Sequence, residues 1–251
     1  MNSTFKPFLF SLCVSITLLI SLPCLAGELD EMAARARNCG VSEAAVSQAE
    51  SLSASTSPDA AASVLSPLLN CCVDQLPITP LETKLAEGVA KRVPPAVIAR
   101  ALQKQLDSYR FARELLLTTA GTSDGVALEI VGNGVAEGVA RSSFSDFVAT
   151  YRDRPGPLFE AGLTMVSLQG QAGFDYALTR RILDRGFASG SLTTEWKYFV
   201  RVILEARKHS IEDQAVTDAA VAVLDEGGPV SDVLPALGFT GRNLGGAGLE
   251  K

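Results

Sequence analysis

The chain has 251 residues, with 22 Lys and Arg against 28 Asp and Glu, so its formal net charge is −6. This acidic balance gives no sign of the basic patch with which proteins bind nucleic acid or an anionic membrane surface. The single histidine, His209, excludes the paired histidines of an HExxH zinc site and leaves one position for a Ser-His-Asp triad or a Cys-His pair. We therefore expect no nucleic-acid partner and no cofactor.

Residues 1–26 have the order of a secretory signal peptide. A polar start with one cation precedes an apolar run over residues 8–20, and Cys24 and Ala26 then occupy the −3 and −1 positions of a cleavage site. A retained membrane anchor is disfavoured, because a spanning helix needs about 20 apolar residues. Lipid attachment at Cys24 is disfavoured because Pro23 stands where Gly, Ala or Ser is usual. We expect export to the periplasm or the medium, with no transmembrane segment in the mature chain.

Three cysteines follow the predicted signal peptide: Cys39, Cys71 and Cys72. In an oxidising compartment they allow one internal disulfide and leave one thiol over. We expect Cys39 to pair with Cys71 or Cys72, because both regions flank short helices that can pack together, whereas a vicinal Cys71–Cys72 bond would be strained. The absence of a CxxC pair disfavours a metal site.

Hydrophobic periodicity predicts helices throughout the rest of the chain. We assign residues 27–241 to an α-helical domain and the Gly-rich residues 242–251 to a disordered tail. The polar segment 51–57 is predicted to be a linker and is a candidate boundary within that domain. No segment alternates with period two for long enough to predict a sheet. The helices are predicted over residues 28–37, 42–52, 57–69, 96–117, 174–187, 196–207 and 214–224.

A short pattern recurs at the start of these helical segments. An apolar residue is followed by Ser, Thr or Pro and then by a helical run, which is typical of an N-cap preceded by a hydrophobic staple. The staple would place Val41 against Val46 or its neighbour, and Val93 against Ile98. The pattern occurs at Val41-Ser42, Ile78-Thr79, Val93-Pro94, Phe144-Ser145, Leu192-Thr193 and Val230-Ser231, and more loosely at Ile211-Glu212.

A weak internal repeat accompanies the helices. The segment EGVAK at 87–91 aligns with EGVAR at 137–141 and RGFAS at 185–189, and Glu226-Gly227 is a degenerate fourth copy. Each copy is predicted to end one helix shortly before the next begins, with a glycine near the helix end that permits either close backbone approach or a left-handed C-cap. We therefore predict an all-α fold of stacked antiparallel helix pairs, arranged either as an irregular bundle or as a short solenoid-like array.

No catalytic, cofactor-binding or metal-binding residue is predicted. The glycine run 132–138 lacks the lysine and hydroxyl of a phosphate-binding loop, and we interpret it as a close-packing helix that is weak or kinked. Glu195 precedes Trp196, the only tryptophan. It is also the third residue of a predicted helix start at Thr193, where a carboxylate is stabilised by the helix dipole and can assist the cap, and we prefer this simpler interpretation. Two carboxylates can hydrolyse a glycosidic bond without histidine, so Glu129 and Glu137 were considered together with Glu195, but none of the three is predicted to be catalytic. His209 is expected to stabilise a helix C-terminus together with Arg207 and Lys208.

The functional hypothesis is therefore based on architecture. Helix arrays present extended surfaces, which favours a protein-binding or scaffold module of the cell envelope. The alternative is a small-molecule or lipid-binding module with an apolar pocket near Phe144, Phe147, Phe159 and Trp196. A carboxylate-dependent envelope hydrolase is a weaker alternative, and enzymatic activity is not expected.

Overall fold

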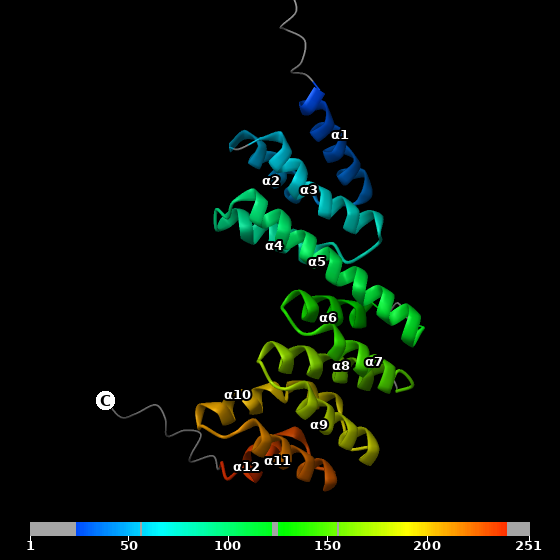
Figure 1. Cartoon of the computed structure of the whole chain (residues 1–251), viewed down its shortest axis with the longest axis vertical. Coiled ribbons are helices and arrows are strands. Elements are labelled where there is room, and N and C mark those ends of the chain that lie inside the picture. The colour runs from blue at the N-terminus through cyan, green and yellow to red at the C-terminus, as the bar shows by residue number, and fades with distance from the viewer. Residues whose placement is uncertain (1–23, 56, 122–124, 155, 240–251) are drawn as a thin grey trace, which may run out of the picture. The chain divides into compact units, whose positions relative to one another are not determined.

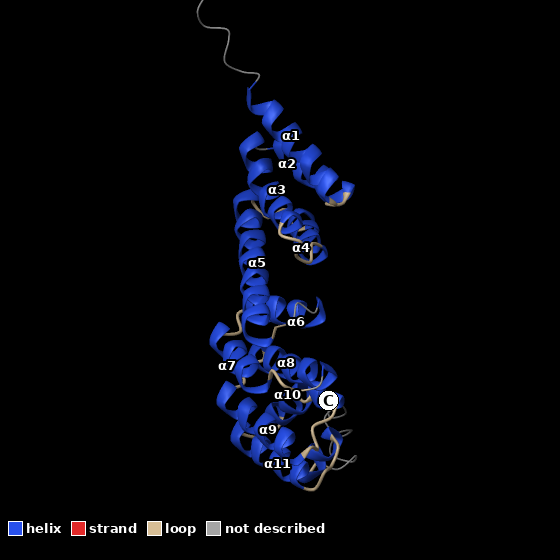
Figure 2. Cartoon of the chain, turned by 90° about the vertical axis from the view of Figure 1, so that its right-hand side faces the viewer, coloured by secondary structure: helices blue, strands red, loops and turns tan. Residues whose placement is uncertain are grey.

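The described part of the chain is entirely helical. A computed structural model describes residues 24–55, 57–121, 125–154 and 156–239, and within these ranges it contains helices and turns but no strand (Figures 1 and 2). This confirms the predicted all-α class. The predicted signal peptide and the predicted tail at 242–251 lie outside the described residues, except that residues 24–26 begin the first helix.

The chain divides into two compact units, residues 1–102 and 103–251, and the division falls inside one long helix, α5. The linker expected at 51–57 lies within the first unit, and its prediction is wrong in part because α2 continues through Ser55. The helices of unit 1 are α1 (Cys24–Cys39), α2 (Glu43–Ser55), α3 (Pro58–Val73), α4 (Thr79–Ala90) and the beginning of α5 (Pro95–Leu115).

In unit 1, α3 packs against both α1 and α2, and α2 also contacts α4. The buried side chains of α1 and α2 are mostly alanines, including Ala33, Ala36 and Ala49, so the helix backbones can approach closely. A disulfide joins Cys39 at the end of α1 to Cys72 near the end of α3, with 6.0 Å between the two Cα atoms. The buried Cys71 keeps its thiol, which donates to the carbonyl of Pro77 at 3.4 Å.

Unit 2 contains the remaining elements, and α8 lies between α6 and α10 (Figure 1). Helix α8 contacts α6, η2 and α10 as well as its chain neighbours α7 and α9, and α9 also packs against α11. Tyr151 and Phe187 join α7 to α9, with ring centroids 4.7 Å apart. The elements are the π-helical η1 (Leu116–Ala120), α6 (Gly125–Ala136), α7 (Arg141–Tyr151), α8 (Gly156–Gln171), α9 (Tyr176–Ser189), the 3-10 helix η2 (Thr194–Tyr198), α10 (Val200–Lys208), α11 (Asp213–Asp225), η3 (Val230–Asp232) and α12 (Val233–Ala236).

Most helix ends in both units share one hydrogen-bonding pattern. A residue just beyond the helix donates its N–H to the carbonyl five residues earlier, and the residue before the donor has a positive φ. This is the Schellman motif, which supplies donors to carbonyls left over at a helix end. Glycine usually has the positive φ, but Gln75, Arg92 and Ser210 have it after α3, α4 and α10. The donor–acceptor pairs are Val41–Ala36, Leu76–Cys71, Val93–Gly88, Val139–Gly134, Phe174–Gln169, Ile211–Ala206, Gly228–Val223 and Phe239–Leu234.

These helix ends explain the recurring apolar residue before the predicted caps. Val41, Val93 and Ile211 are the donors of Schellman motifs, so each of them closes the preceding helix as well as leading into the next. Ser42 also acts as predicted, since its hydroxyl accepts from Ala45 N at 3.3 Å. The cap predicted at Phe144-Ser145 is wrong, because both residues lie inside α7. At α4 the N-cap is Ile78 and not the predicted Thr79. Thr193 and Glu212 are the N-caps of η2 and α11, but neither side chain makes a capping hydrogen bond. Ser231 lies within η3.

The glycines of the predicted repeat have two different roles. Gly138 and Gly227 follow α6 and α11 with φ values of 105° and 73°, as a left-handed helix end requires. Gly88 and Gly186 lie inside α4 and α9, where an added Cβ would come within 3.0 Å of Ile98 and Leu192, respectively. These two copies nevertheless stand at the ends of their helices, at Ala90 and Ser189, as predicted, and their glycines permit close packing.

Candidate functional site

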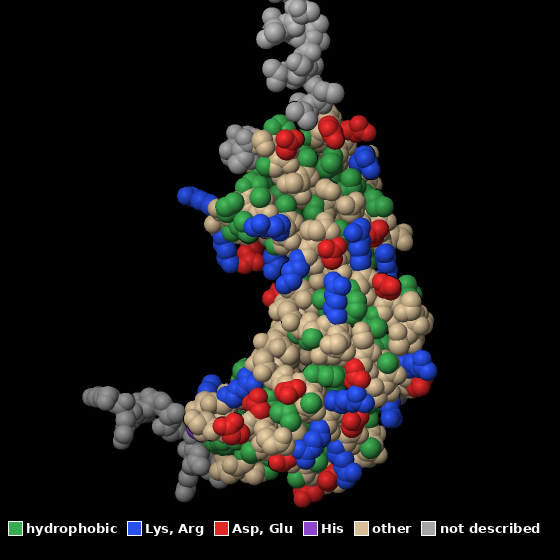
Figure 3. All heavy atoms as spheres, in the orientation of Figure 1, with side chains coloured by type: hydrophobic (Ala, Val, Ile, Leu, Met, Phe, Trp, Pro, Cys, Tyr) green, Lys and Arg blue, Asp and Glu red, His purple; other side chains and the backbone are tan. Residues whose placement is uncertain are grey.

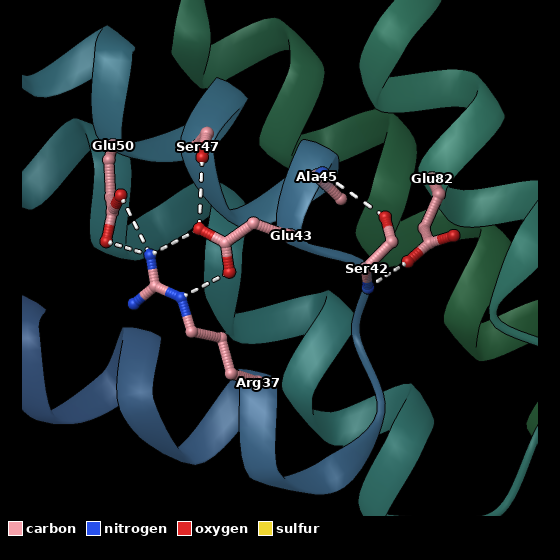
Figure 4. Close-up of polar contacts among 7 residues, drawn as sticks. All are labelled: Arg37, Ser42, Glu43, Ala45, Ser47, Glu50 and Glu82. Carbon is pink, nitrogen blue, oxygen red and sulfur yellow. Dashed lines mark hydrogen bonds and ion pairs between the residues drawn. The ribbon is translucent and has the colours of Figure 1, made fainter.

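Arg37 organises the polar surface between α1 and α2 in unit 1. Its Nε atom donates to Glu43 at 2.8 Å, and its Nη2 atom donates to Glu50 at 3.0 Å (Figure 4). The hydrogen bonds to these carboxylates raise the pKa of Arg37, and the same contact lowers the pKa of Glu43. Both carboxylates come from α2, so this charge cluster ties α2 to the last turn of α1.

Two N–H groups at the N-terminus of α2 are bonded to side chains of the protein. Glu82 of α4 accepts a hydrogen bond from Ser42 N at 2.7 Å, and the Ser42 hydroxyl accepts from Ala45 N (Figure 4). A carboxylate at this position also complements the positive end of the helix dipole. Glu82 therefore takes the place that an external anion would need, and this end of α2 is structural.

A second polar network connects α7 to α9 in unit 2. Arg180 donates to both oxygens of Asp146, at 2.7 and 2.8 Å, and the Tyr176 hydroxyl donates to the same carboxylate at 2.7 Å. The Tyr151 hydroxyl donates to Asp184, one turn further along α9. Burial, and then the hydrogen bond to an aspartate, raises the pKa of each tyrosine far above its usual range. At neutral pH these tyrosines are donors, and the network contains no activated nucleophile.

This network predicts a loss of stability at alkaline pH. The folded pKa values of Tyr151 and Tyr176 exceed the usual value of about 10, so the contribution is complete below pH 10. It declines as pH rises further, because the unfolded chain then ionises while the folded chain keeps its protons. Replacing both tyrosines with Phe should flatten the fall in urea midpoint between about pH 10 and 12. Tyr198→Phe, which alters a hydroxyl outside the network, should leave the slope unchanged.

The remaining arginines of α9 also pair with acids. Arg181 bonds to Asp218 at 2.6 Å and Arg185 bonds to Asp225, so both hold α9 to α11. Basic and acidic side chains are interspersed over this part of unit 2 (Figure 3). A groove of about 510 Å³ runs beside these arginines, but their aspartate partners neutralise its walls. We therefore assign this face a structural role.

Arg207 acts on a different helix from the one that the sequence indicated. Its guanidinium donates to the carbonyls of Ala172 and Gly173, just beyond α8, and pairs with Asp213 at 2.6 Å. Arg207 therefore caps α8 and links it to the start of α11. His209 is the C-cap of α10, and its ring lies 4.7 Å from that of Phe239. His209 Nε2 is 3.5 Å from Glu205, and no nucleophile contacts this histidine among the described contacts.

The carboxylates considered for catalysis are dispersed. Glu129 and Glu137 are exposed on α6 and just after it, and Glu195 is exposed on η2. Trp196 has no exposed surface, so Glu195 and Trp196 do not form an acid-and-aromatic surface for a sugar. The N-cap residue Thr193 makes no side-chain cap bond, so the expected cap beside Glu195 is not formed.

The aromatic residues expected to line an apolar pocket instead fill the core. Phe144, Phe147 and Trp196 have no exposed surface, and Phe159 is 7% exposed. The Phe147 ring lies 5.3 Å from that of Phe159 and against the backbone of Gly162, where a Cβ would approach it to 2.5 Å. Close packing of this kind leaves no room for a ligand among these rings.

A shallow groove crosses three elements of unit 2. It has a volume of about 330 Å³, and its floor is mainly aliphatic and hydroxyl-bearing. Val126 in its lining is 53% exposed. Lys197, also in its lining, adjoins Tyr198, which lies outside the lining, is 44% exposed and has its ring centroid 4.8 Å from the Arg201 guanidinium. We call this surface the α6–α8–η2 groove; it is lined by Val126, Ile130, Pro157, Glu160, Ala161, Thr164, Thr194 and Lys197.

Two cations beside the α6–α8–η2 groove lack an acidic partner. Among the described residues, no carboxylate lies within ion-pairing distance of Lys197 or Arg201, whereas Arg180, Arg181 and Arg207 are all paired. This surface could not be predicted from the sequence, because its residues are ordinary types that only the fold brings together. An exposed tyrosine flanked by two unpaired cations is suited to an acidic partner.

No group of three or more His, Cys, Asp and Glu residues in the described ranges is arranged to hold a metal ion. No described helix is both long and apolar enough to cross a bilayer. No protein family, curated protein or solved structure matches this chain.

Proposed function

We propose that the protein is an exported binding module that recognises another protein through the α6–α8–η2 groove. The observation that carries this proposal is the groove itself, where exposed Val126 and Tyr198 flank a path across three elements. The partner segment places an apolar residue against Val126 and Ile130 and an acidic residue beside Lys197 and Arg201. Apolar contact with charge complementarity at the rim is the usual composition of such interfaces.

The proposed architecture of unit 2 is a short stack of antiparallel helix pairs. Support comes from the contacts of α8 with α6 and α10, and of α9 with α11, which join helices two elements apart. The turns after α6, α8 and α10 are short and close with the same Schellman motif. Stacks of this kind present extended surfaces built from successive helices, and the α6–α8–η2 groove is likewise built from several elements.

Export is proposed from two observations. Residues 1–26 have the composition of a cleavable signal peptide, and a Cys39–Cys72 disulfide is typical of oxidising compartments. Cleavage before Gly27 would remove the first three residues of α1 and leave its buried Leu29 in place. Intact mass measurement of protein from the envelope fraction tests the site: a chain beginning at Met1 would contradict it.

Charge reversal at the groove tests the binding proposal. Arg201→Glu and Val126→Asp should each reduce recovery of the partner at least tenfold in affinity purification from the envelope fraction, consistent with loss of about 1.4 kcal/mol or more of binding free energy. The matched controls are Arg100→Glu on α5 and Val73→Asp on α3, which change exposed residues in unit 1. Purification that recovers the protein alone under several conditions, or equal recovery by groove and control variants, would contradict the proposal.

A further inference from the structure

The last described residue fixes where the chain continues after the helices of unit 2. Phe239 is 8% exposed, and its ring lies 4.7 Å from that of His209, the C-cap of α10. Its N–H group donates to Leu234 O, and α12 packs against α10, so Phe239 is anchored. Residues 240–251, which we call the 240–251 segment, therefore start beside the end of α10. The α6–α8–η2 groove lies toward the other end of this helix, since η2 directly precedes it.

An exposed strip connects these two points along α10. Tyr198 and Leu204 are 44% and 48% exposed. Arg201 stands between them, with its guanidinium 4.8 Å from the Tyr198 ring centroid. Arg201 and Leu204 are three residues apart, so they are neighbours on the helix surface. Together with Val126 in the groove, three of the large hydrophobic side chains exposed in the described residues lie on this path.

The 240–251 segment is long enough to follow the strip into the groove. Arg201 is eight residues before His209, a rise of about 12 Å along α10. Leu249 is ten residues beyond Phe239, which allows about 33 Å when the chain is extended. A Gly-rich chain of ten residues has a root-mean-square reach of roughly 18 Å. A tether whose mean reach is comparable with the span that it bridges gives a local concentration on the order of 1 mM.

The apolar side chains of the 240–251 segment are spaced to reach both exposed apolar surfaces. Its large hydrophobic residues, Leu244 and Leu249, are five residues apart, which separates them by up to about 17 Å. Leu244 follows the anchored Phe239 closely enough to cover Leu204 on the strip. Leu249 then comes within reach of the groove lining around Val126. Each contact would remove exposed apolar surface from water, which favours the bound arrangement.

Charges in the groove complement the two residues that follow Leu249. Glu250 and Lys251 place opposite charges next to each other. The lining contains one acid, Glu160, and one cation, Lys197, and among the described residues neither lies within ion-pairing distance of an opposite charge. Pairing of Glu250 with Lys197 and of Lys251 with Glu160 would satisfy all four. We propose that the 240–251 segment occupies the α6–α8–η2 groove of its own chain and competes there with the partner protein; the competition rests on the proposed function, whereas the occupancy does not.

A peptide with the sequence of residues 240–251 and blocked ends tests the occupancy. The full chain carrying Leu249→Asp/Glu250→Lys, here the segment variant, should bind this peptide with a Kd below about 1 mM, the local concentration that the tether provides. The unmodified protein should bind it at least twofold more weakly, because its own segment then covers at least half of the grooves. Isothermal titration measures both affinities. A Kd above about 1 mM for the segment variant, or equal affinity of the two proteins, would overturn the proposal.

Substitutions in the groove locate the peptide. Lys197→Glu, added to the segment variant, should weaken peptide binding at least tenfold, because it replaces the partner of Glu250 with a like charge. The matched control is Lys104→Glu, which reverses an exposed charge on α5 in the same unit and should leave the affinity unchanged. Equal effects of these two substitutions would contradict the assignment of the peptide to the groove.

Hydrogen exchange shows whether the contact forms within one chain. Peptides from η2 and α6 should exchange at least twofold faster in the segment variant than in the unmodified protein. This difference should stay constant over an approximately fiftyfold range of protein concentration, as an intramolecular contact requires. Arg242→Gln changes a charge of the segment near its anchored end and should exchange as the unmodified protein does. Protection that grows with protein concentration would assign the groove to the segment of a second copy and overturn the proposal.

The partner protein separates this inference from the proposed function. The segment variant should recover at least twofold more partner than the unmodified protein, since its groove is no longer covered. Unchanged recovery by a variant that does bind the peptide would contradict the groove as the partner's site, and with it the proposed function. Loss of the partner in Arg201→Glu without any peptide binding would contradict only the occupancy by the 240–251 segment.

Discussion

Removing the disulfide by Cys39→Ser/Cys72→Ser should lower the free energy of unfolding of unit 1 by about 3–4 kcal/mol. The bond links residues 33 positions apart, and the chain-entropy model gives that magnitude for a loop of this size. Apart from the disulfide, α1 and α2 are held mainly through buried alanines, which contribute little apolar area to offset the loss. Native-state hydrogen exchange measures the effect separately in peptides from each unit.

The double substitution is needed because Cys71 adjoins Cys72. A single Cys72→Ser change would leave Cys39 and Cys71 free to form a substitute bond. Cys71→Ala is the matched control, since it removes the buried thiol but retains the Cys39–Cys72 bond. Reducing agent should destabilise unit 1 in this control as it does in the unmodified protein. Equal loss of protection in peptides from α8 and α9 would contradict the assignment of the disulfide to unit 1 alone.

The helices themselves could be predicted because their cores follow hydrophobic periodicity. The segments predicted at 96–117, 174–187 and 214–224 correspond to α5, α9 and α11, with ends displaced by one or two residues. The segment predicted at 196–207 is split between the 3-10 helix η2 and α10. Burial of Trp196 and Phe199 against α8 imposes that break, and such a tertiary effect leaves no periodic signal in the sequence.

Helix ends were harder to predict than helices. The left-handed residues Gln75, Arg92 and Ser210 are not glycine, so composition gave no indication of their backbone conformation. The apolar residues beside them were detected but were assigned to the following cap alone. One apolar side chain there serves two helices, and only the hydrogen bonds of Val93 and Ile211 to the preceding helix reveal it.

Sequence reasoning about function concentrated on residues with distinctive chemistry. It singled out the only histidine, the only tryptophan and several carboxylates, which the structure assigns to packing, to helix ends or to solvent. The candidate surface depends instead on common residue types such as Val126, Lys197 and Tyr198. Their significance lies in the surface that they share, and this property is not visible along the chain.

Gly132→Ala should destabilise unit 2 by about 3 kcal/mol, although alanine ordinarily stabilises a helix by about 1 kcal/mol relative to glycine. A Cβ at this position of α6 would lie 2.2 Å from Cδ1 and 2.5 Å from Cε1 of Tyr109. Tyr109 is fully buried, and its hydroxyl donates to Asn133 Oδ1 at 2.8 Å, so the ring cannot withdraw without losing that bond. The clash therefore outweighs the gain in helix propensity. Urea denaturation followed by Trp196 fluorescence measures the change.

Gly125→Ala on the same helix is the control that isolates the contact. Nothing lies within 4 Å of a Cβ at Gly125, so this variant should be as stable as the unmodified protein or slightly more stable. Adding Tyr109→Leu to each variant completes a double-mutant cycle. The smaller leucine side chain should restore part of the lost free energy of unfolding in Gly132→Ala, but should give no such gain in Gly125→Ala. Equal stability of Gly132→Ala and Gly125→Ala would show that α6 and Tyr109 do not pack as described. If Gly132→Ala destabilises unit 2 while Gly125→Ala does not, then Gly132 is required for the close packing of Tyr109 against α6. The glycine run then has a structural role, and phosphate binding is not needed to explain it.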